Sequence, residues 1–317
     1  MESKLNPNKI AVIGAGAVGA TTAYALMTQG VGSEIVLIDI DKDKAEGEAM
    51  DLQHGTSFVN PVDIYAGDYK DLSDAHLIII TAGAAQKPGE SRMDLIQKNT
   101  AVFKNIIASI TKYNQDAVLL IVTNPVDILT YVSWKLSGFP ANRVLGSGTV
   151  LDSSRFRAML SKNCSVAASN VHGYIIGEHG DSEVAVWSLT NIAGTTIKNY
   201  CPICDNSCSR EDLQQISDKV KNSAYEIIDK KGSTFYAVAL AVSRIARAIL
   251  RDENAVLTVS SIMKGYYGVN DLSLSLPTLV NANGIEKVLE LPLSPEEEKA
   301  FKDSAAEIRK NIDKLDL

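Results

Sequence analysis

The sequence predicts an α/β fold, in which a doubly wound and mostly parallel sheet is followed by an α+β domain. Three observations lead to this prediction. Short runs rich in Ile, Val and Leu alternate with segments of helical length in the first half of the chain. A glycine-rich turn directly follows the first run. Past about Gly148 the alternation gives way to long helices and short strands.

The first half contains four apolar runs typical of strands that are buried on both faces of a parallel sheet. These predicted strands are residues 10–13, 35–38, 77–80 and 118–122. The predicted helices between them include residues 21–28, 42–53 and 93–111. Because strands and helices alternate, we expect βαβ units with helices on both faces of the sheet.

The second half has a different pattern. The predicted helices are residues 151–160, 211–230 and 234–250, and the predicted strands are residues 170–176, 255–263, 272–276 and 286–291. A last helix is expected after Ser294, a good N-cap residue that is followed by Pro295 and three glutamates. The change of pattern suggests a dinucleotide-binding domain at residues 1–147 and a substrate domain at residues 148–317.

Composition narrows the possible partners. The 317 residues carry a formal net charge of −7, which argues against nucleic acid or an anionic membrane as the main partner. Apolar runs such as residues 117–122 are far shorter than the ~20 residues that cross a bilayer. The first seven residues lack a basic segment followed by an apolar core, so we expect a cytoplasmic protein.

The four cysteines are Cys164, Cys201, Cys204 and Cys208. The last three are spaced closely enough to suggest zinc ligands, but no fourth ligand is evident. We expect no metal and reduced cysteines.

The glycine-rich turn predicts a dinucleotide site. Gly14 permits a tight turn, Gly16 lets the backbone approach a pyrophosphate, and Gly19 allows close packing of helix on strand. Asp39 lies at the end of the second predicted strand, where a carboxylate can bind the ribose hydroxyls. A carboxylate there would repel a 2′-phosphate, so NAD is favoured over NADP. Glycines used only for packing are the alternative.

A small-residue loop, residues 81–92, follows the third predicted strand. In an open α/β sheet, ligands bind where strands end, so Gln86 and Arg92 are candidates to close over a ligand. The alternative is a solvated surface turn.

A histidine between glycines follows the strand predicted over residues 170–176. His179 has a side chain suited to proton transfer near neutral pH. Asp152 and Arg155 are three residues apart on a predicted helix and can therefore point into one cleft. Taken alone, that pair could equally be an ion pair on a solvated helix.

Several longer motifs occur together in this chain: GAGAVG, DLQHG, TAGAAQKPGESR, VTNPVD, GSGTVLDSSRFR and IIGEHGDSE. On these motifs, which extend over nearly the whole length, the chain resembles the bacterial NAD-dependent L-lactate dehydrogenases of the lactate/malate dehydrogenase superfamily. The resemblance implies a Rossmann-type domain followed by a catalytic domain, with NAD as cofactor and pyruvate or L-lactate as substrate.

The resemblance also implies roles for the candidate residues. His179 would protonate the keto oxygen as hydride arrives from the nicotinamide, and Asp152 would orient the imidazole. Arg155 would hold the substrate carboxylate with two parallel N–H bonds. Arg92 would stabilise the charge on the carbonyl oxygen after the loop closes. The other implied substrate contacts are Gln86, Asn124 and Thr234, the last expected to open a helix. The implied cofactor contacts are Gly14, Gly16, Val18, Gly19, Asp39, Thr81, Gly83 and Asn124.

Gln86 is the implied specificity residue. An arginine at this position would pair with the second carboxylate of a dicarboxylic substrate, whereas a neutral glutamine would leave that carboxylate buried without a counter-charge. The resemblance therefore favours pyruvate. A malate or other 2-hydroxy-acid dehydrogenase is the close alternative, and a non-catalytic NAD-binding protein is the remote one.

Arg157 lies about 200° around the helix from Arg155, so it does not share the active-site face. Arg157 and His172 match positions that bind fructose 1,6-bisphosphate between subunits in many bacterial members. The resemblance thus implies an allosteric anion site and a homotetramer. A solvated arginine and a histidine with its bonds satisfied in a strand are the alternative.

Overall fold

The computed structural model describes residues 5–84, 89, 91–201 and 210–315. Of Arg92 and Arg210, only the backbone is described. Within this part of the chain, no helix is long and apolar enough to cross a membrane.

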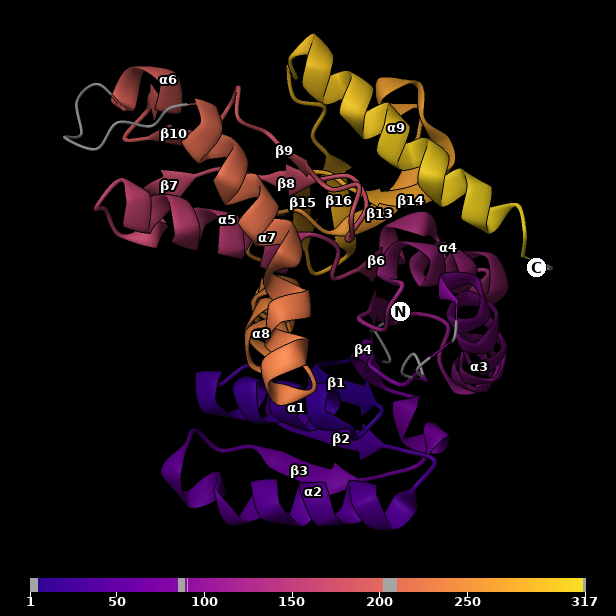
Figure 1. The fold of residues 1–317 in the computed structure, drawn as a ribbon. Helices are drawn as coiled ribbons and strands as arrows, with labels where there is room; N and C mark the ends of the chain where they lie inside the picture. Colours follow the sequence, from indigo (N-terminus) through magenta and orange to yellow (C-terminus); the bar gives the residue numbers. More distant parts are fainter. Residues whose placement is uncertain (1–4, 85–88, 90, 202–209, 316–317) are drawn as a thin grey trace.

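The largest sheet of the described chain confirms the predicted α/β class (Figure 1). Its strands lie in the order β14 (Asn270–Ser275), β13 (Ser260–Lys264), β6, β5, β4, β1, β2 and β3, and the last six of these are parallel. The parallel strands are β1 (Asn6–Ile13), β2 (Glu34–Ile38), β3 (Asp63–Ala66), β4 (Ala75–Ile80), β5 (Val118–Ile121) and β6 (Val144–Gly146). The predicted strands correspond to β1, β2, β4 and β5. The short strands β3 and β6 were not among them.

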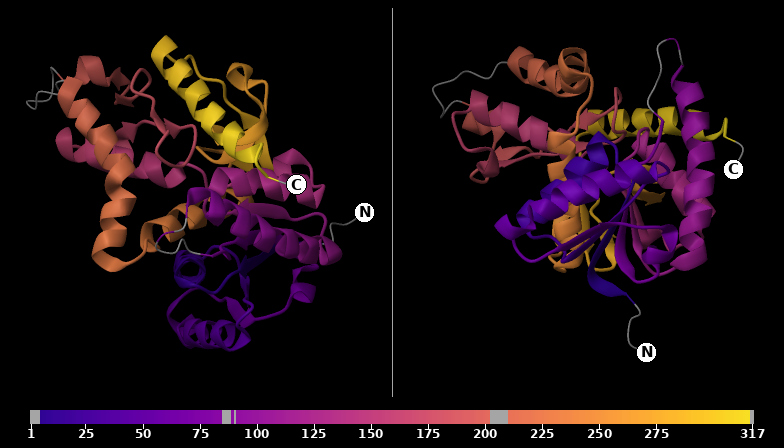
Figure 2. Two further views of the ribbon diagram at one scale, coloured as in Figure 1. Left: turned by 45° about the vertical axis from the view of Figure 1, so that its right-hand side comes forward. Right: turned by 90° about the horizontal axis from the view of Figure 1, so that it is seen from below.

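Helices cover both faces of this sheet, as Figure 2 shows in two further views. The helices of the first half are α1 (Ala17–Gln29), α2 (Lys42–His54), α3 (Arg92–Tyr113) and α4 (Val126–Ser137). Alternate residues of β1 face opposite layers. Ile10 and Val12 belong to a core with α1 and α2, whereas Ala11 and Ile13 belong to a core with α3 and α4. The continuous apolar runs in the sequence reflect this burial on two sides.

The strand order places a switch point between β1 and β4. From β1 the chain first builds outward to β2 and β3, and then returns to the other side of β1 as β4. The loops after β1 and β4 therefore leave the sheet side by side, and such a crevice is where open α/β sheets bind ligands. The backbone N–H groups of Thr81 and Ala82 both donate to Ile13 O, at 2.9 Å each.

The second half contributes smaller sheets and the antiparallel edge of the large sheet. Its strands are β7 (Val171–His172), β8 (Ile175–Ile176), β9 (Val184–Ala185), β10 (Asn191–Ile192), β11 (Thr195–Thr196), β12 (Ala255–Leu257), β13 (Ser260–Lys264), β14 (Asn270–Ser275), β15 (Thr278–Asn281) and β16 (Gly284–Val288). Its helices are α5 (Val150–Asn163), α6 (Ile197–Tyr200), α7 (Arg210–Lys231), α8 (Tyr236–Leu250) and α9 (Pro295–Ile312). Short 3₁₀ helices are η1 (Thr56–Phe58), η2 (Tyr69–Leu72), η3 (Ala141–Arg143), η4 (Ala168–Asn170) and η5 (Tyr266–Gly268).

Two predicted strands were wrong, because each is two strands in different sheets. Residues 170–176 divide into β7 and β8 at Gly173, where a Cβ would lie 2.6 Å from the Phe156 ring. Residues 255–263 divide into β12 and β13 at Thr258. The carbonyl oxygen of Thr258 accepts the N–H of Thr149 at 3.0 Å, which takes it out of the strand ladder.

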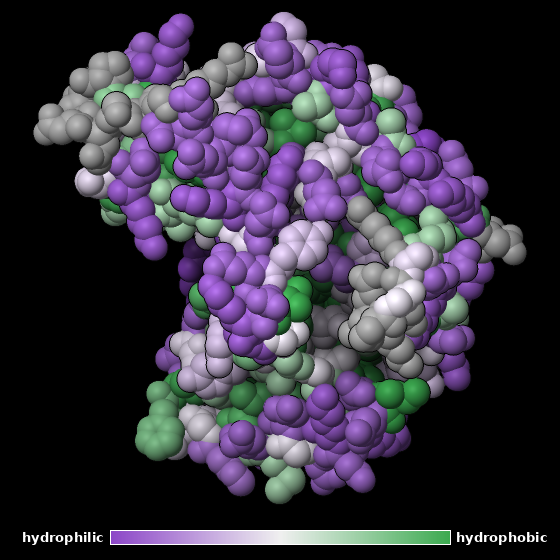
Figure 3. All heavy atoms as spheres, viewed as in Figure 1, coloured by the Kyte–Doolittle hydropathy of each residue, from purple (hydrophilic) through white to green (hydrophobic). Residues whose placement is uncertain are grey.

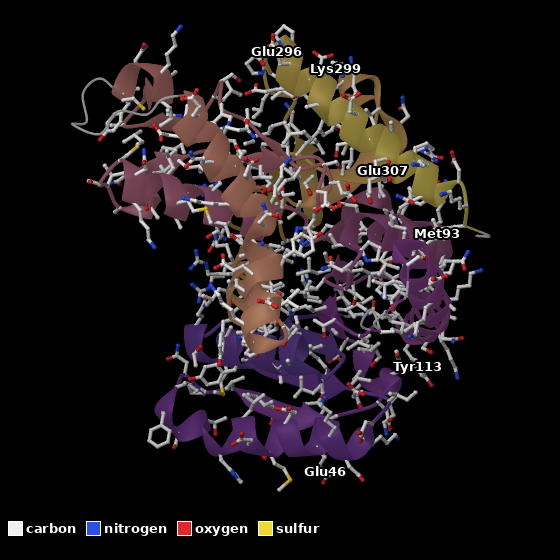
Figure 4. The ribbon with its side chains drawn as sticks, in the orientation of Figure 1. Glu46, Met93, Tyr113, Glu296, Lys299 and Glu307 are labelled. Carbon is white, nitrogen blue, oxygen red and sulfur yellow. The ribbon has the colours of Figure 1, made fainter. Side chains whose placement is uncertain are left out.

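The predicted helices of the second half correspond to α5, α7 and α8, although α5 extends three residues past its predicted end, and the short helix α6 was not predicted. Thr234 does not open a helix, because α8 begins at Tyr236 and the φ of Phe235 (−152°) is not helical. The last helix does begin after Ser294, whose side chain and that of Glu297 cap each other's backbone N–H. Glu296, Lys299 and Glu307 of α9 point outward in Figure 4, as expected for the polar face of a packed helix.

Candidate active site

The glycine-rich turn after β1 has the geometry that its sequence predicts. Gly14 has φ +104°, and a Cβ there would lie 2.6 Å from Ala82 N. A Cβ on Gly19 would lie 1.8 Å from Gly14 O, so only glycine lets α1 approach the strand. A Cβ on Gly16 would meet nothing within 4 Å, which leaves open space at the N-terminus of α1. An anionic pyrophosphate fits this arrangement.

Asp39 follows β2 directly and lies beside this turn. Its Oδ2 accepts the backbone N–H of Ala15 at 2.6 Å, and its Oδ1 accepts that of Asp41 at 3.0 Å. Val18 is half-buried on the first turn of α1. The predicted ribose ligand therefore lies beside the predicted phosphate turn.

The loop after β4 begins at the same crevice. Thr81 Oγ donates to Gly14 O at 2.9 Å, and a Cβ on Gly83 would lie 2.3 Å from the Thr123 methyl group. Asn99, a buried residue of α3 that the sequence analysis missed, accepts the N–H of Ala84 at 2.8 Å and donates to Asn124 O at 2.9 Å. Asn99 thus joins the start of this loop to the exposed Asn124 after β5. In the sequence, the sign of this role is that Asn99 is a polar residue on the apolar face of α3.

The three candidate residues of the second half lie together. His179, in the loop between β8 and β9, has its Nδ1 2.6 Å from Asp152 Oδ2. The other oxygen of Asp152 accepts a hydrogen bond from Arg155 Nη1 at 2.8 Å. The Asp152 side chain is only 3% exposed, whereas His179 and Arg155 retain 24% and 13% exposure. A buried carboxylate therefore holds two partly accessible groups, a titratable imidazole and a guanidinium.

The electrostatics favour a charged pair at this site. Burial by itself would lower the pKa of His179, but the charge and hydrogen bond of Asp152, with the charges of Asp127 and Glu183, raise it to about 9. Burial would raise the pKa of Asp152, but His179 and Arg155 hold it below its ordinary value. The imidazolium form is therefore favoured at neutral pH, as a proton donor requires.

Two further acidic residues lie near His179, and neither was predicted from the sequence as part of the site. Asp127, in the first turn of α4, accepts the backbone N–H of His179 at 2.7 Å. Burial and the charge of Asp152 raise the pKa of Glu183 to about 8. Glu183 is 6% exposed, and its Oε1 has no hydrogen-bond partner among the described residues. The signal for each was its place in a quoted motif, VTNPVD for Asp127 and IIGEHGDSE for Glu183.

Other predicted residues are only partly accounted for. Gln86, Cys204 and Cys208 lie outside the described residues, as does the side chain of Arg92, which opens α3 after the N-cap Ser91. Thr234 is half-buried between α7 and α8. Figure 4 labels Met93 and Tyr113 at the two ends of α3. Cys164 is buried, and no described group of His, Cys, Asp or Glu is arranged to hold a metal.

Arg157 and His172 lie on neighbouring segments, α5 and β7. Arg157 Nε donates to the carbonyl oxygen of Gly173, the residue after His172, at 3.0 Å. The guanidinium lies 5.6 Å from the centre of the Tyr174 ring and contacts no carboxylate of the described chain. Burial lowers the pKa of Arg157. His172 is exposed on β7.

Two family models match the chain over almost its whole length. The model of the lactate/malate dehydrogenase NAD-binding domain matches residues 8–146, and that of the lactate/malate dehydrogenase alpha/beta C-terminal domain matches residues 149–316.

Individual proteins of known name are similar over the same length. The L-lactate dehydrogenase of Thermoanaerobacter pseudethanolicus is 60% identical over 310 residues, which cover 98% of this chain and 100% of that protein. L-lactate dehydrogenase 1 of Clostridium acetobutylicum is 56% identical over 97% of this chain and 98% of its own. The crystal structure of the minor L-lactate dehydrogenase of Enterococcus mundtii in the ligands-bound form has a TM-score of 0.95 at 43% identity, covering 98% of this chain and 99% of that one.

Proposed function

The chain belongs to the lactate/malate dehydrogenase family, and on this premise we propose that it is an L-lactate dehydrogenase that reversibly reduces pyruvate with NADH. The observation that carries the proposal is the contact of Asp152 with both His179 and Arg155. A 2-keto acid has its reacting oxygen and its carboxylate on adjacent carbons. His179 as proton donor and the guanidinium of Arg155, which one carboxylate holds together, can therefore bind the keto oxygen and the carboxylate of such a substrate.

NAD is the cofactor of this enzyme, and when bound in its reduced form it supplies the hydride for the keto carbon. Gly14, Gly16 and Gly19 would hold the pyrophosphate with the N-terminus of α1, and Asp39 would bind the ribose hydroxyls. The remaining proposed cofactor contacts are Val18, Thr81, Gly83 and Asn124. The open space at Gly16 supports this assignment. We further propose that the nucleotide domain is residues 1–147 and the catalytic domain residues 148–317.

His179 would transfer the proton that the reduction needs. Its Nδ1 is engaged by Asp152, which leaves Nε2 to donate to the keto oxygen. Arg155 would bind the substrate carboxylate in a bidentate manner, and Arg92 would stabilise the developing charge on the keto oxygen. Asn124 and Thr234 would complete the substrate contacts. In the reverse direction, His179 would accept the hydroxyl proton of L-lactate.

The substrate preference follows from the neutral side chain of Gln86. We expect kcat/KM for pyruvate to exceed that for oxaloacetate by at least ~100-fold, because a buried carboxylate without a counter-charge costs about 3 kcal/mol or more. Steady-state NADH oxidation with both substrates measures this ratio. A preference for oxaloacetate would instead support a malate dehydrogenase. Tight NADH binding without turnover of any 2-keto acid would support a non-catalytic NAD-binding protein.

We also propose that Arg157 and His172 bind fructose 1,6-bisphosphate between subunits of a homotetramer. A half-buried guanidinium without a carboxylate among the described residues, next to an exposed histidine, is suited to a phosphate. Apolar side chains at the surface support association between subunits. They include Tyr24, Met50, Phe58, Tyr236 and Leu240. Several apolar areas are visible in Figure 3 near the end that holds α1 and α2.

The bisphosphate is expected to lower the KM for pyruvate by ~5- to 100-fold, the usual range of allosteric coupling. Rates at low pyruvate, with and without the effector, measure this, and light scattering on the same samples gives the mass. Arg157→Gln should remove the response, because it removes the charge that binds phosphate. Arg244→Gln, which removes the charge of a half-buried arginine on α8, is the control. Equal rates with and without the bisphosphate would rule out activation.

A further inference from the structure

We propose that Asp127 is a positioning residue for proton transfer: its buried carboxylate fixes the backbone of His179, and its charge favours the protonated imidazole. This inference rests on the proposed function. Asp127 is 2% exposed, and its Oδ2 accepts the backbone N–H of His179 at 2.7 Å. Its Oδ1 accepts the hydroxyl of Ser260 at 2.6 Å. Both carboxylate oxygens are therefore used.

The position of Asp127 links parts of the chain that are far apart in sequence. It lies in the first turn of α4, His179 follows β8, and Ser260 begins β13. The hydroxyl of Ser273 on β14 also donates to the backbone carbonyl of Asp127. The loop that carries the imidazole is thus bonded to a helix of the first half of the chain. Asp152 holds the ring of His179, and Asp127 holds its backbone.

A neutral acceptor could fix a backbone N–H equally well, so the carboxylate calls for a further reason. His179 is faced by three acidic groups, namely Asp152 on α5, Asp127 on α4 and Glu183 in its own loop, and all three raise its pKa. Asp127 is itself faced by Glu178 and His179. Burial raises the pKa of Asp127, while the hydrogen bonds from Ser260 and His179 oppose this, and the result is about 6. Asp127 therefore carries its charge between pH 7 and 9, where the state of His179 matters.

The sign of the expected pH effect follows from these charges. Pyruvate reduction needs protonated His179, so kcat/KM should hold up to about pH 9 and fall above it. Without the charge of Asp127, the imidazole loses its proton at lower pH. We expect Asp127→Asn to move the alkaline midpoint down by ~1 pH unit, which makes the loss at pH 9 about fivefold greater than at pH 7. Glu183 is present in both proteins and does not account for the difference.

Two substitutions separate charge from position. In Asp127→Asn the amide oxygen can still accept from His179 and the amide NH₂ can donate to the Ser260 hydroxyl, so kcat at pH 7 should change less than ~3-fold. In Asp127→Ser the side chain is too short to reach His179, so kcat at pH 7 should fall by roughly 10- to 100-fold. The assay is pyruvate reduction from pH 6 to 10. Circular dichroism and NADH fluorescence report folding and cofactor binding.

Two controls and four outcomes define the test. Ser260→Ala keeps the charge and should leave the midpoint within ~0.3 unit. Asp116→Asn removes a charge from a side chain that is 72% exposed and should not move the midpoint either.

An active wild-type protein whose Asp127→Asn midpoint is unchanged overturns the charge effect and with it the proposal. Unchanged kcat in Asp127→Ser overturns the positioning effect. Failure of both Asp127 variants to fold assigns the residue to stability alone and overturns the proposal as well. A wild-type protein that does not reduce pyruvate contradicts the proposed function instead.

Discussion

Replacement of His179 by alanine is expected to lower kcat for pyruvate reduction by about 10²- to 10⁴-fold, the usual contribution of a general acid. The reason is that His179 is the one described imidazole held by a buried carboxylate, with 24% of its side chain still accessible. Alanine leaves the keto oxygen without a proton donor as negative charge develops on it. Steady-state NADH oxidation at saturating pyruvate measures the loss.

The NADH affinity of His179→Ala distinguishes a loss of proton transfer from a loss of the folded structure. The turn at Gly14–Gly19 and Asp39 belong to the first half of the chain, so the affinity for NADH should stay within about threefold of wild type. His54→Ala, at the exposed end of α2, is the matched control and should retain full activity. If His179→Ala kept more than a tenth of the wild-type rate, another group would have to supply the proton.

Replacement of Arg155 by lysine is expected to lower kcat/KM for pyruvate by roughly 10- to 150-fold, mainly through KM. Lysine keeps the charge but cannot form two parallel bonds to a carboxylate, and each charged hydrogen bond is worth about 1.5–3 kcal/mol. The change also weakens the contact of Arg155 with Asp152, which is 2.8 Å in the native chain. Initial rates over a wide range of pyruvate concentration separate KM from kcat.

The control for this substitution is Arg244→Lys on α8. Arg244 also contacts a carboxylate, that of Glu253 at 2.7 Å, but Glu253 is not among the proposed site residues, so the substitution should leave both constants unchanged. A fall in kcat with no change in KM would argue that Arg155 acts on the transition state and does not anchor the carboxylate.

Much of the fold could be predicted because the core strands are buried on both faces. β1, β2, β4 and β5 appear as continuous apolar runs, since each face of the sheet is covered by helices. β3 was missed because it is an edge strand in which only Ile64 is buried. The strands at residues 170–176 and 255–263 were each predicted as one, because apolar periodicity does not reveal where a chain passes from one sheet to another.

The functional site could be predicted only in part from the sequence. The glycines, Asp39, His179, Asp152 and Arg155 stand in motifs whose spacing has a local physical meaning, and the resemblance joined these motifs into one enzyme. Asn99 and Asp127 were missed because their partners lie in distant segments. Asp127 meets His179 across 52 residues and Ser260 across 133.

The sequence by itself determined the class of this protein: an α/β chain with a dinucleotide turn, a carboxylate for the ribose, and the residue types that a 2-hydroxy-acid dehydrogenase needs. These follow from local features, namely hydrophobic periodicity, glycine conformation and the chemistry of single side chains. Only the tertiary structure decided that Asp152 contacts both His179 and Arg155, and that Asp127 lies under the backbone of His179. The physical reason is that hydrogen bonds and pKa values depend on distance and burial in space, which long-range packing sets and sequence spacing does not.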